Sequence, residues 1–250
     1  MAGHSKWANI KRKKEKEDAW RGKAFTKVAR QITIAAREGG GDINANFRLR
    51  MAVEAARAIN MPNENIQRAI NRGTGDVDSV SYEELVYEGY GPGGVALYMQ
   101  VATDNRNRTA GDLRWILSKH GGNLGESGCV AWMFEKKGSI IISGDNLPTE
   151  DELMLAALEA GAEDVITSDE GYEIVCAPEN FQAVQENLRQ SAIPLTTAEL
   201  VMEPKTTVTL GEEEARHVLA LIEALEEHDD IQTVFSNLEL TPEVEAALSE

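Results

Sequence analysis

The residues with the clearest chemistry are cations near the amino terminus. Lys11, Arg12, Lys13 and Lys14 are consecutive, and further Lys and Arg residues follow as far as residue 72. Ammonium and guanidinium groups in such a run bind phosphate oxygens by charge and, for Arg, by bidentate hydrogen bonds. The run therefore indicates an anionic polymer as the partner, and nucleic acid is the first candidate.

Charge is divided unequally along the chain. Residues 1–73 contain 16 Lys and Arg against seven Asp and Glu, whereas residues 74–250 contain nine against 35. An acidic protein is repelled by polyanions. A basic N-terminal segment followed by an acidic remainder (residues 74–250) therefore predicts one localised anionic partner surface.

Five of the cations from residue 16 onward fit one face of a helix, and Arg21 does not. At about 100° per residue they project within one sector, and an apolar stripe falls on the opposite side. The alternative is an ordinary solvated face, but a single sign of charge directly after the basic run favours nucleic-acid contact. The ridge consists of Lys16, Lys23, Lys27, Arg30 and Arg37, and the stripe of Phe25, Val28, Ile32, Ala35 and Ala36.

Aromatic residues are interleaved with these cations, a pattern that allows bases to stack while phosphates are held. Trp7 is the candidate for stacking, and the alternative is that it anchors the basic arm to the rest of the protein. Arg57, Arg68 and Arg72 extend the positive surface. The predicted nucleic-acid-binding residues are Lys6, Trp7, Lys11, Arg12, Lys13, Lys14, Lys23, Lys27, Arg30, Arg37, Arg48 and Arg50.

A second candidate site is the loop 104–109, of sequence DNRNRT. Arg106 and Arg108 stand just before a predicted helix over 109–120, whose free N–H groups favour an anion, so phosphate contact is one interpretation. In the other, Thr109 caps the helix with Asp112 at its third position, and Asp104 and the amides stabilise the turn.

Signs of catalysis are weak. None of the four histidines has metal-ligand spacing with another His or with Cys, and no nucleophile elbow or P-loop is present. Gly89, Gly91 and Gly94 spell G-x-G-x-x-G, but the next segment reads as a strand and not a helix, so a hairpin turn is predicted instead of a dinucleotide site. We expect no enzyme, no metal and no cofactor; an enzyme acting here would need Glu88 or Asp104 as its titratable group.

The sequence indicates neither a membrane-spanning segment nor a secretory signal. No stretch approaches the roughly 18 apolar residues of a membrane span, and the basic amino terminus lacks the apolar core of a secretory signal. We expect a cytoplasmic monomer that makes no membrane contact.

Helix signals dominate the first 73 residues. Gly39 to Gly41 end the first helix, Asn44 or Asn46 caps a second, and Pro62 begins a third. Strands are then predicted at 82–90, 95–103 and 129–134. Residues 139–204 follow the order βαββαβ of a ferredoxin-like sandwich, in which Thr149 and Glu152 form a capping box and Gly161 ends the helix.

The remaining pieces complement one another. A βαβ unit is predicted over residues 206–210, 211–227 and 231–238. Its single helix cannot cover both faces of its own sheet, and the ββαβ segment 78–135 lacks cover in the same way. We therefore predict an α+β protein with an N-terminal three-helix domain (1–76) and two ferredoxin-like α/β domains. The second domain is discontinuous (77–137 plus 205–250), and the third (138–204) is inserted into it.

At these residues the chain resembles the YebC family, which includes PmpR-type bacterial regulators and mitochondrial translational activators of cytochrome oxidase subunit I. The motifs that carry the resemblance are MAGHSKWANIK, RGKAFTK, AAREGGGD, NFRLR, NMP, IQRAINRGTG, YEGYGPGG, DNRNRT and GGNLG. Arg12-Lys13 stands where the family pattern has a His-Arg pair, and Cys129 where Ser is more usual, which puts an imidazole contact at position 12 in doubt.

The resemblance implies three domains with the third inserted into the second, and a non-enzymatic nucleic-acid-binding regulator. Two hypotheses follow. The first is a DNA-binding transcriptional regulator acting through the basic helical domain; the second is a translation factor whose basic arm binds ribosomal RNA on the ribosome.

Overall fold

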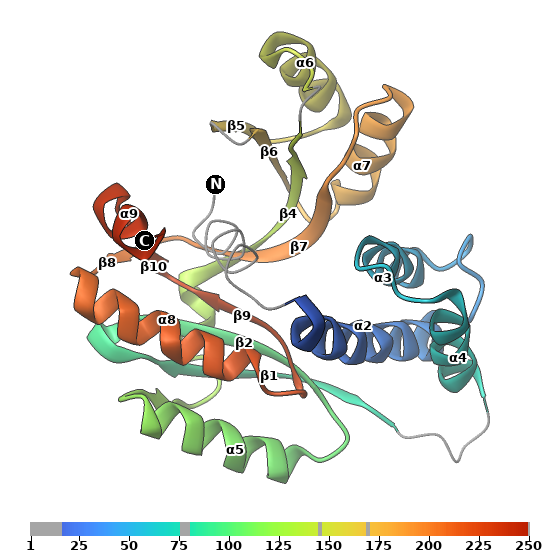
Figure 1. Ribbon diagram of the computed structural model, residues 1–250. Coiled ribbons are helices and arrows are strands. Elements are labelled where there is room, and N and C mark those ends of the chain that lie inside the picture. Colours follow the sequence, from blue (N-terminus) through green and yellow to red (C-terminus); the bar gives the residue numbers. More distant parts are fainter. Residues whose placement is uncertain (1–16, 76–80, 145–146, 169–170, 250) are drawn as a thin grey trace.

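The computed structural model describes residues 17–75, 81–144, 147–168 and 171–249 (Figure 1). Three groups of elements are evident: a helical domain, a middle domain and an inserted domain. We keep the predicted division into three parts as a proposal; the strand over 134–142 spans the predicted boundary at 137/138 and belongs with the inserted domain. No helix in the described ranges is long and apolar enough to cross a membrane.

The N-terminal helical domain packs three helices around one apolar core. They are α2 (Glu17–Gly39), α3 (Phe47–Ala58) and α4 (Asn63–Thr74). Ile32 and Leu49 are completely buried there, and Ile66 and Ile70 project inward from α4 as predicted. The predicted stripe of α2 is confirmed, with Ile32, Ala35 and Ala36 in the core and Phe25 and Val28 at its edge.

Asn46 fixes the turn between α2 and α3. Its Oδ1 accepts a hydrogen bond from the backbone N–H of Leu49, which confirms the predicted cap. Its Nδ2 donates to the carbonyls of Ala35 and Gly40, and Gly40 has the left-handed φ of 83° that follows a helix end. The Asn46 side chain thus forms hydrogen bonds with backbone groups at the end of α2 and at the start of α3.

The middle domain is a four-stranded antiparallel sheet in the order β3-β1-β2-β9. Its elements are β1 (Glu83–Tyr90), the turn η1 (Pro92–Gly94), β2 (Ala96–Thr103), α5 (Arg106–Lys119), β3 (Asn123–Leu124), α8 (Glu212–Glu226) and β9 (Ile231–Ser236). Helices α5 and α8 cover one face and bury Leu97, Leu117 and Leu221 against it (Figure 1). The β1–β2 pairing confirms the hairpin predicted at the glycines.

The inserted domain has the strand order β5-β6-β4-β7, all antiparallel, with two helices on one face. Its elements are β4 (Phe134–Ile142), α6 (Glu150–Ala160), β5 (Asp164–Ser168), β6 (Gly171–Cys176), α7 (Phe181–Gln190) and β7 (Thr197–Pro204). This is the ferredoxin-like order. The capping box of Thr149 and Glu152 is present, and Gly161 ends α6 with a φ of 94°.

Three expectations about local structure are wrong. Residues 129–133 are not a strand: a bend at 129–130 leads into η2 (Ala131–Met133), because the carboxylate of Glu88 accepts hydrogen bonds from the N–H groups of Val130 and Ala131, and only Phe134 is in a strand. Only β8 (Val208–Thr209) forms within 206–210, and it pairs with β10 (Leu238–Glu239), not with the main sheet. Helix α5 begins three residues early, capped by Asn105 and not by Thr109.

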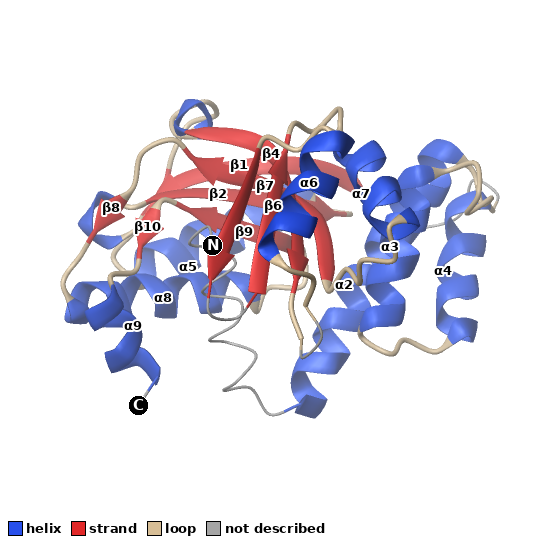
Figure 2. Cartoon of the chain, turned by 90° about the horizontal axis from the view of Figure 1, so that it is seen from above, coloured by secondary structure: helices blue, strands red, loops and turns tan. Residues whose placement is uncertain are grey.

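The helical domain also contacts the inserted domain. Figure 2 shows α3 beside α7, where the rings of Phe47 and Phe181 meet edge to face with centroids 6.4 Å apart. Arg189 pairs with Glu54 across the same boundary at 2.6 Å.

The short helix α9 (Pro242–Ser249) packs on α8 of the middle domain through Val244.

Candidate nucleic-acid interface

The basic arm lies outside the described residues. Lys6, Trp7, Lys11, Arg12, Lys13 and Lys14, with Lys16 of the ridge, all precede the first described position. Their role in binding nucleic acid stays a prediction.

Lys23 and Lys27 of α2 face the middle domain. Lys23 Nζ lies 3.4 Å from the Glu227 carboxylate, and Lys27 Nζ donates to the Glu226 carbonyl at 2.6 Å. These partners form the carboxyl-terminal end of α8, where unpaired carbonyls and the helix dipole favour cations. The ridge therefore meets protein along this stretch.

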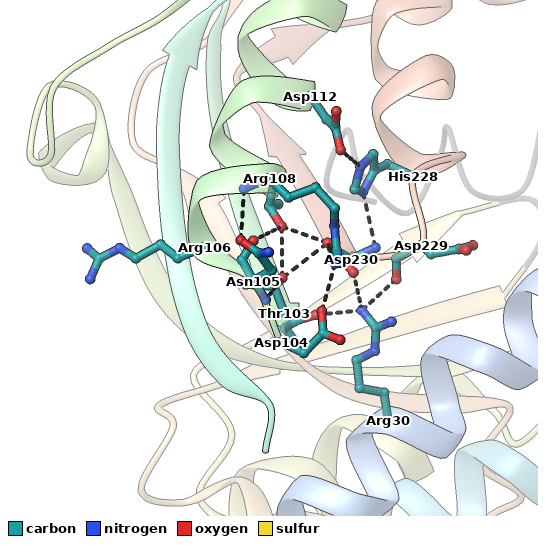
Figure 3. Close-up of polar contacts among 12 residues, drawn as sticks. Arg30, Thr103, Asp104, Asn105, Arg106, Arg108, Asp112, His228, Asp229 and Asp230 are labelled. Carbon is teal, nitrogen blue, oxygen red and sulfur yellow. Dashed lines mark hydrogen bonds and ion pairs between the residues drawn. The ribbon is translucent and has the colours of Figure 1, made fainter. Parts of the chain in front are cut away.

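Arg30 departs furthest from the sequence expectation. Its side chain is only 10% exposed, and Nη1 lies 2.8 Å from Asp230 Oδ1 while donating to the carbonyls of Ala102 and Asp229 (Figure 3). Its guanidinium also lies over the Tyr82 ring, 4.7 Å from the centroid. The expectation that Arg30 projects into solvent is wrong, because Asp230 and two carbonyls surround it.

Asp230 is the centre of this polar cluster. Its Oδ2 accepts hydrogen bonds from Thr109 Oγ1 at 2.6 Å and from Arg108 Nη2 at 2.8 Å, and Thr103 Oγ1 lies 3.1 Å away (Figure 3). Burial alone would raise the pKa of the carboxyl, but the bonds from Thr109, Arg108 and Arg30 outweigh it and lower the pKa to about 2. The carboxylate thus joins α2, α5 and β9.

Arg106 and Arg108, which were predicted in a loop, lie in the first turn of α5 and have different surroundings. Arg108 Nη2 bridges Asp104 and Asp230, both at 2.8 Å, and those two hydrogen bonds raise its pKa. Arg106 instead projects outward with 66% of its side chain exposed, and its nearest carboxylate, that of Glu83, is 3.8 Å away. Phosphate contact stays a prediction for both, with Arg106 the freer of the two.

The remaining predicted cations lie on the helical domain. Arg48 pairs with Glu38 and Glu84, while Arg50 lies 3.5 Å from Glu186 and over the Phe47 ring. Arg37 is exposed in the last turn of α2. Burial lowers the pKa of Arg48, but the two glutamates outweigh it and raise that pKa overall.

Three further arginines give the helical domain an outward positive face. Arg68 and Arg72 stand one turn apart on the exposed side of α4, and Arg57 is exposed in the last turn of α3. Among the described residues, no ion pair or side-chain hydrogen bond engages these three. Gln67 and Asn71 lie beside them on α4 and bond each other at 2.9 Å. Like charges one turn apart cost stability unless an anion neutralises them.

Comparison with known proteins identifies the family. The model of the TACO1/YebC N-terminal domain matches residues 5–76, and that of the TACO1/YebC second and third domain matches residues 82–238. The chain belongs to the TACO1/YebC family. This agrees with the resemblance seen in the motifs.

Relatives of this TACO1/YebC chain are similar over their full length. A protein of Halothermothrix orenii is 53% identical over 100% of both chains, and one of Desulforamulus reducens is 57% identical over 96% of this chain and 99% of its own. Both are named "Probable transcriptional regulatory protein", which supports a regulatory role here. The crystal structure of a conserved hypothetical protein from Aquifex aeolicus matches with a TM-score of 0.82 and 47% identity, covering 90% of this chain and 92% of that one.

Sequence reasoning missed the two carboxylates that organise this family member. Asp230 follows Asp229 between a helix and a strand, where acidic residues read as a solvated turn. The sequence suggests Glu88 only as a catalytic group, yet it is 4% exposed and accepts N–H bonds from Gly128, Val130 and Ala131, each at 2.7 Å. The available signal was an acidic residue inside an apolar strand, which must find donors.

Within the described ranges, no three His, Cys, Asp or Glu side chains come together as a metal site.

A shallow groove of about 280 Å³ between α5 and α8 is lined by Trp115, Ile116, Lys119, His120, Ala224, Glu227 and His228. His228 Nε2 is 3.2 Å from Asp112, so one imidazole of the groove is already engaged.

Proposed function

We propose that the protein is a DNA-binding transcriptional regulator that binds through residues 1–76 and catalyses no reaction. The observation that carries the proposal is the segregation of charge: 16 Lys and Arg against seven acidic residues up to residue 73, and nine against 35 thereafter. Phosphate neutralisation supplies most of the free energy of such binding. The names of the relatives support the regulatory part.

The phosphate contacts are assigned to two surfaces. One is the basic run Lys11 to Lys14, and the other is the outward face of α4 with Arg68 and Arg72. Lys23, Lys27 and Arg30 are assigned a different role, because their contacts with α8 and Asp230 join two domains. The protein thus uses one side of its helical domain for assembly and leaves another for the partner.

Fluorescence anisotropy with a labelled DNA duplex tests the assignment. The Arg68→Ala, Arg72→Ala double variant should bind more weakly, and the slope of log affinity against log salt should fall by about 0.9 for each phosphate that the variant no longer neutralises. Replacing Lys11, Arg12, Lys13 and Lys14 by Ala should lower the slope further. The matched control is Lys136→Ala with Lys205→Ala, which removes two exposed cations from the acidic part of the chain after residue 73. Equal losses of affinity in the control and the α4 variant would show a response to net charge only, and the assignment would fail.

A second candidate function is a translation factor whose basic arm and α4 face bind ribosomal RNA. The acidic excess after residue 73 favours it, because a straight duplex continuing past the helical domain would meet carboxylates. Folded RNA can end or bend at the positive surface, and single-stranded bases can stack on aromatic side chains.

Ultraviolet crosslinking in growing cells separates the two functions. Sequencing of recovered DNA and RNA should show discrete promoter DNA for the regulator, absent in the Lys11 to Lys14 variant. Crosslinks concentrated in ribosomal RNA would instead establish the translation factor. We further propose a cytoplasmic monomer, to be checked by cell fractionation and analytical sedimentation. Saturable turnover of nucleotides that is abolished by Asp104→Ala would contradict the non-enzymatic assignment.

A further inference from the structure

Helix α6 of the inserted domain carries apolar residues on two opposite faces. Leu153, Ala157 and Ala160 are buried against the sheet, as in any surface helix. Met154, Leu155 and Leu158 lie on the other side, with exposed fractions of 40%, 62% and 55%. A helix that is apolar on both faces is normally buried on both.

The exposed trio forms one continuous stripe. At about 100° per residue, Met154, Leu158 and Leu155 occupy a sector of roughly 100°, whose centre lies about 140° from the centre of the buried stripe. Such a spacing matches the apolar seam by which one helix receives another. In Figure 1, α6 stands at the outer end of the inserted domain, away from the helical domain and the middle sheet.

The surroundings of the stripe have one sign of charge. Between Lys137 and Arg189 the sequence contains no Lys or Arg and twelve Asp and Glu residues. Asp151 lies within the sector of the stripe, and Glu159 and Glu152 lie just beyond its Leu155 edge, all three exposed on the helix. A partner must therefore supply both apolar side chains and positive charge, and a second copy of the same face would be repelled.

We propose that the outer face of α6 binds a basic amphipathic helix of a partner protein. The apolar side of that helix packs on Met154, Leu155 and Leu158, and its Lys or Arg residues pair with Asp151 and Glu159. The flexible thioether of Met154 lets the surface adapt to different partner side chains. This site lies in the inserted domain, so it is independent of the nucleic-acid surface proposed above.

A defined peptide tests the proposal on the full-length protein. The probe is a fluorescein-labelled helical peptide of about 18 residues, made of Leu and Lys with Leu at i, i+3, i+4 and i+7, compared with a scrambled peptide of the same composition. The ordered peptide should bind more tightly, and Leu155→Ser with Leu158→Ser should weaken it by about tenfold or more. Val86→Ser, which removes an exposed apolar side chain from β1 of the middle domain, is the matched control and should bind like wild type.

A second variant keeps the test independent of folding. Asp151→Asn with Glu159→Gln leaves the apolar stripe intact and should weaken binding and reduce its salt dependence. Equal binding of ordered and scrambled peptides, or unchanged affinity in the double Ser variant, would overturn the proposal in favour of unspecific charge attraction. Self-association that the double Ser variant abolishes would overturn it too, because the occupant would then be a second copy.

Discussion

Replacing Asp230 by Asn should destabilise the protein far more than the same change one residue earlier. Asp230 is 4% exposed and holds Arg30, Arg108 and Thr109. Its pKa falls from 3.8 to about 2 in the folded protein, and this shift corresponds to about 2.5 kcal/mol in favour of the charged form. Asn loses that contribution at neutral pH and leaves Arg30 buried without its counter-charge, so we expect a loss of about 2.5 to 4 kcal/mol.

Equilibrium urea unfolding at pH 7, followed by circular dichroism, measures this loss. Asp229→Asn is the control, because Asp229 is exposed and contributes only its backbone carbonyl to the cluster. We expect that control to change the free energy of unfolding by less than about 0.5 kcal/mol. Similar losses of stability in both variants, or a loss below about 1 kcal/mol for Asp230→Asn, would refute the structural role assigned to the carboxylate.

The same variant predicts a pH dependence. The folded pKa lies below the unfolded value, so the carboxylate stabilises the protein above about pH 4 and this stabilisation disappears as pH falls toward 2. The difference in stability between wild type and Asp230→Asn should therefore be constant from about pH 5 to 7 and shrink below about pH 4. A difference that stays constant down to about pH 2 would contradict the assigned pKa.

Two further changes test close contacts in the fold. Glu88→Gln should cost about 1.5 to 3 kcal/mol, because an amide cannot accept the three N–H bonds that the carboxylate accepts; urea unfolding measures it, with the exposed Glu126→Gln as the control that should change little. Gly73→Ala should lower the melting temperature, since the new Cβ would lie 2.4 Å from the Thr33 carbonyl oxygen where α4 crosses α2. Gly111→Ala in α5, where nothing lies within 4 Å, should instead raise the melting temperature slightly, and the opposite order would show that the contact is not rigid.

Local signals in the sequence predicted most of the elements. The caps at Asn46 and Thr149 and the helix end at Gly161 depend on neighbours within a few residues, which the sequence displays directly. The discontinuous middle sheet followed from counting strands against helices. Those inferences required no knowledge of distant contacts.

The errors arose where distant contacts decide. Arg30 has the helical position of a surface cation, but its partner Asp230 is 200 residues away in the sequence and nothing local announces it. Residues 129–134 have strand composition, yet the carboxylate of Glu88, some forty residues earlier, accepts the N–H groups that a strand would offer to a neighbour. The periodicity of apolar and charged residues predicts which face of a helix is apolar and which is charged. It does not predict which other element packs against the charged face.

The position of β9 has a consequence for synthesis of the chain. β9 pairs with β2, and Leu97 lies opposite Ser236. While the ribosome translates the inserted domain, one edge of β2 has no partner, and the backbone groups along that edge stay unpaired until β9 emerges. The inserted domain is complete at Pro204 and needs nothing that follows for its own sheet. All strands of the inserted domain's sheet are therefore synthesised before the last strand of the middle sheet.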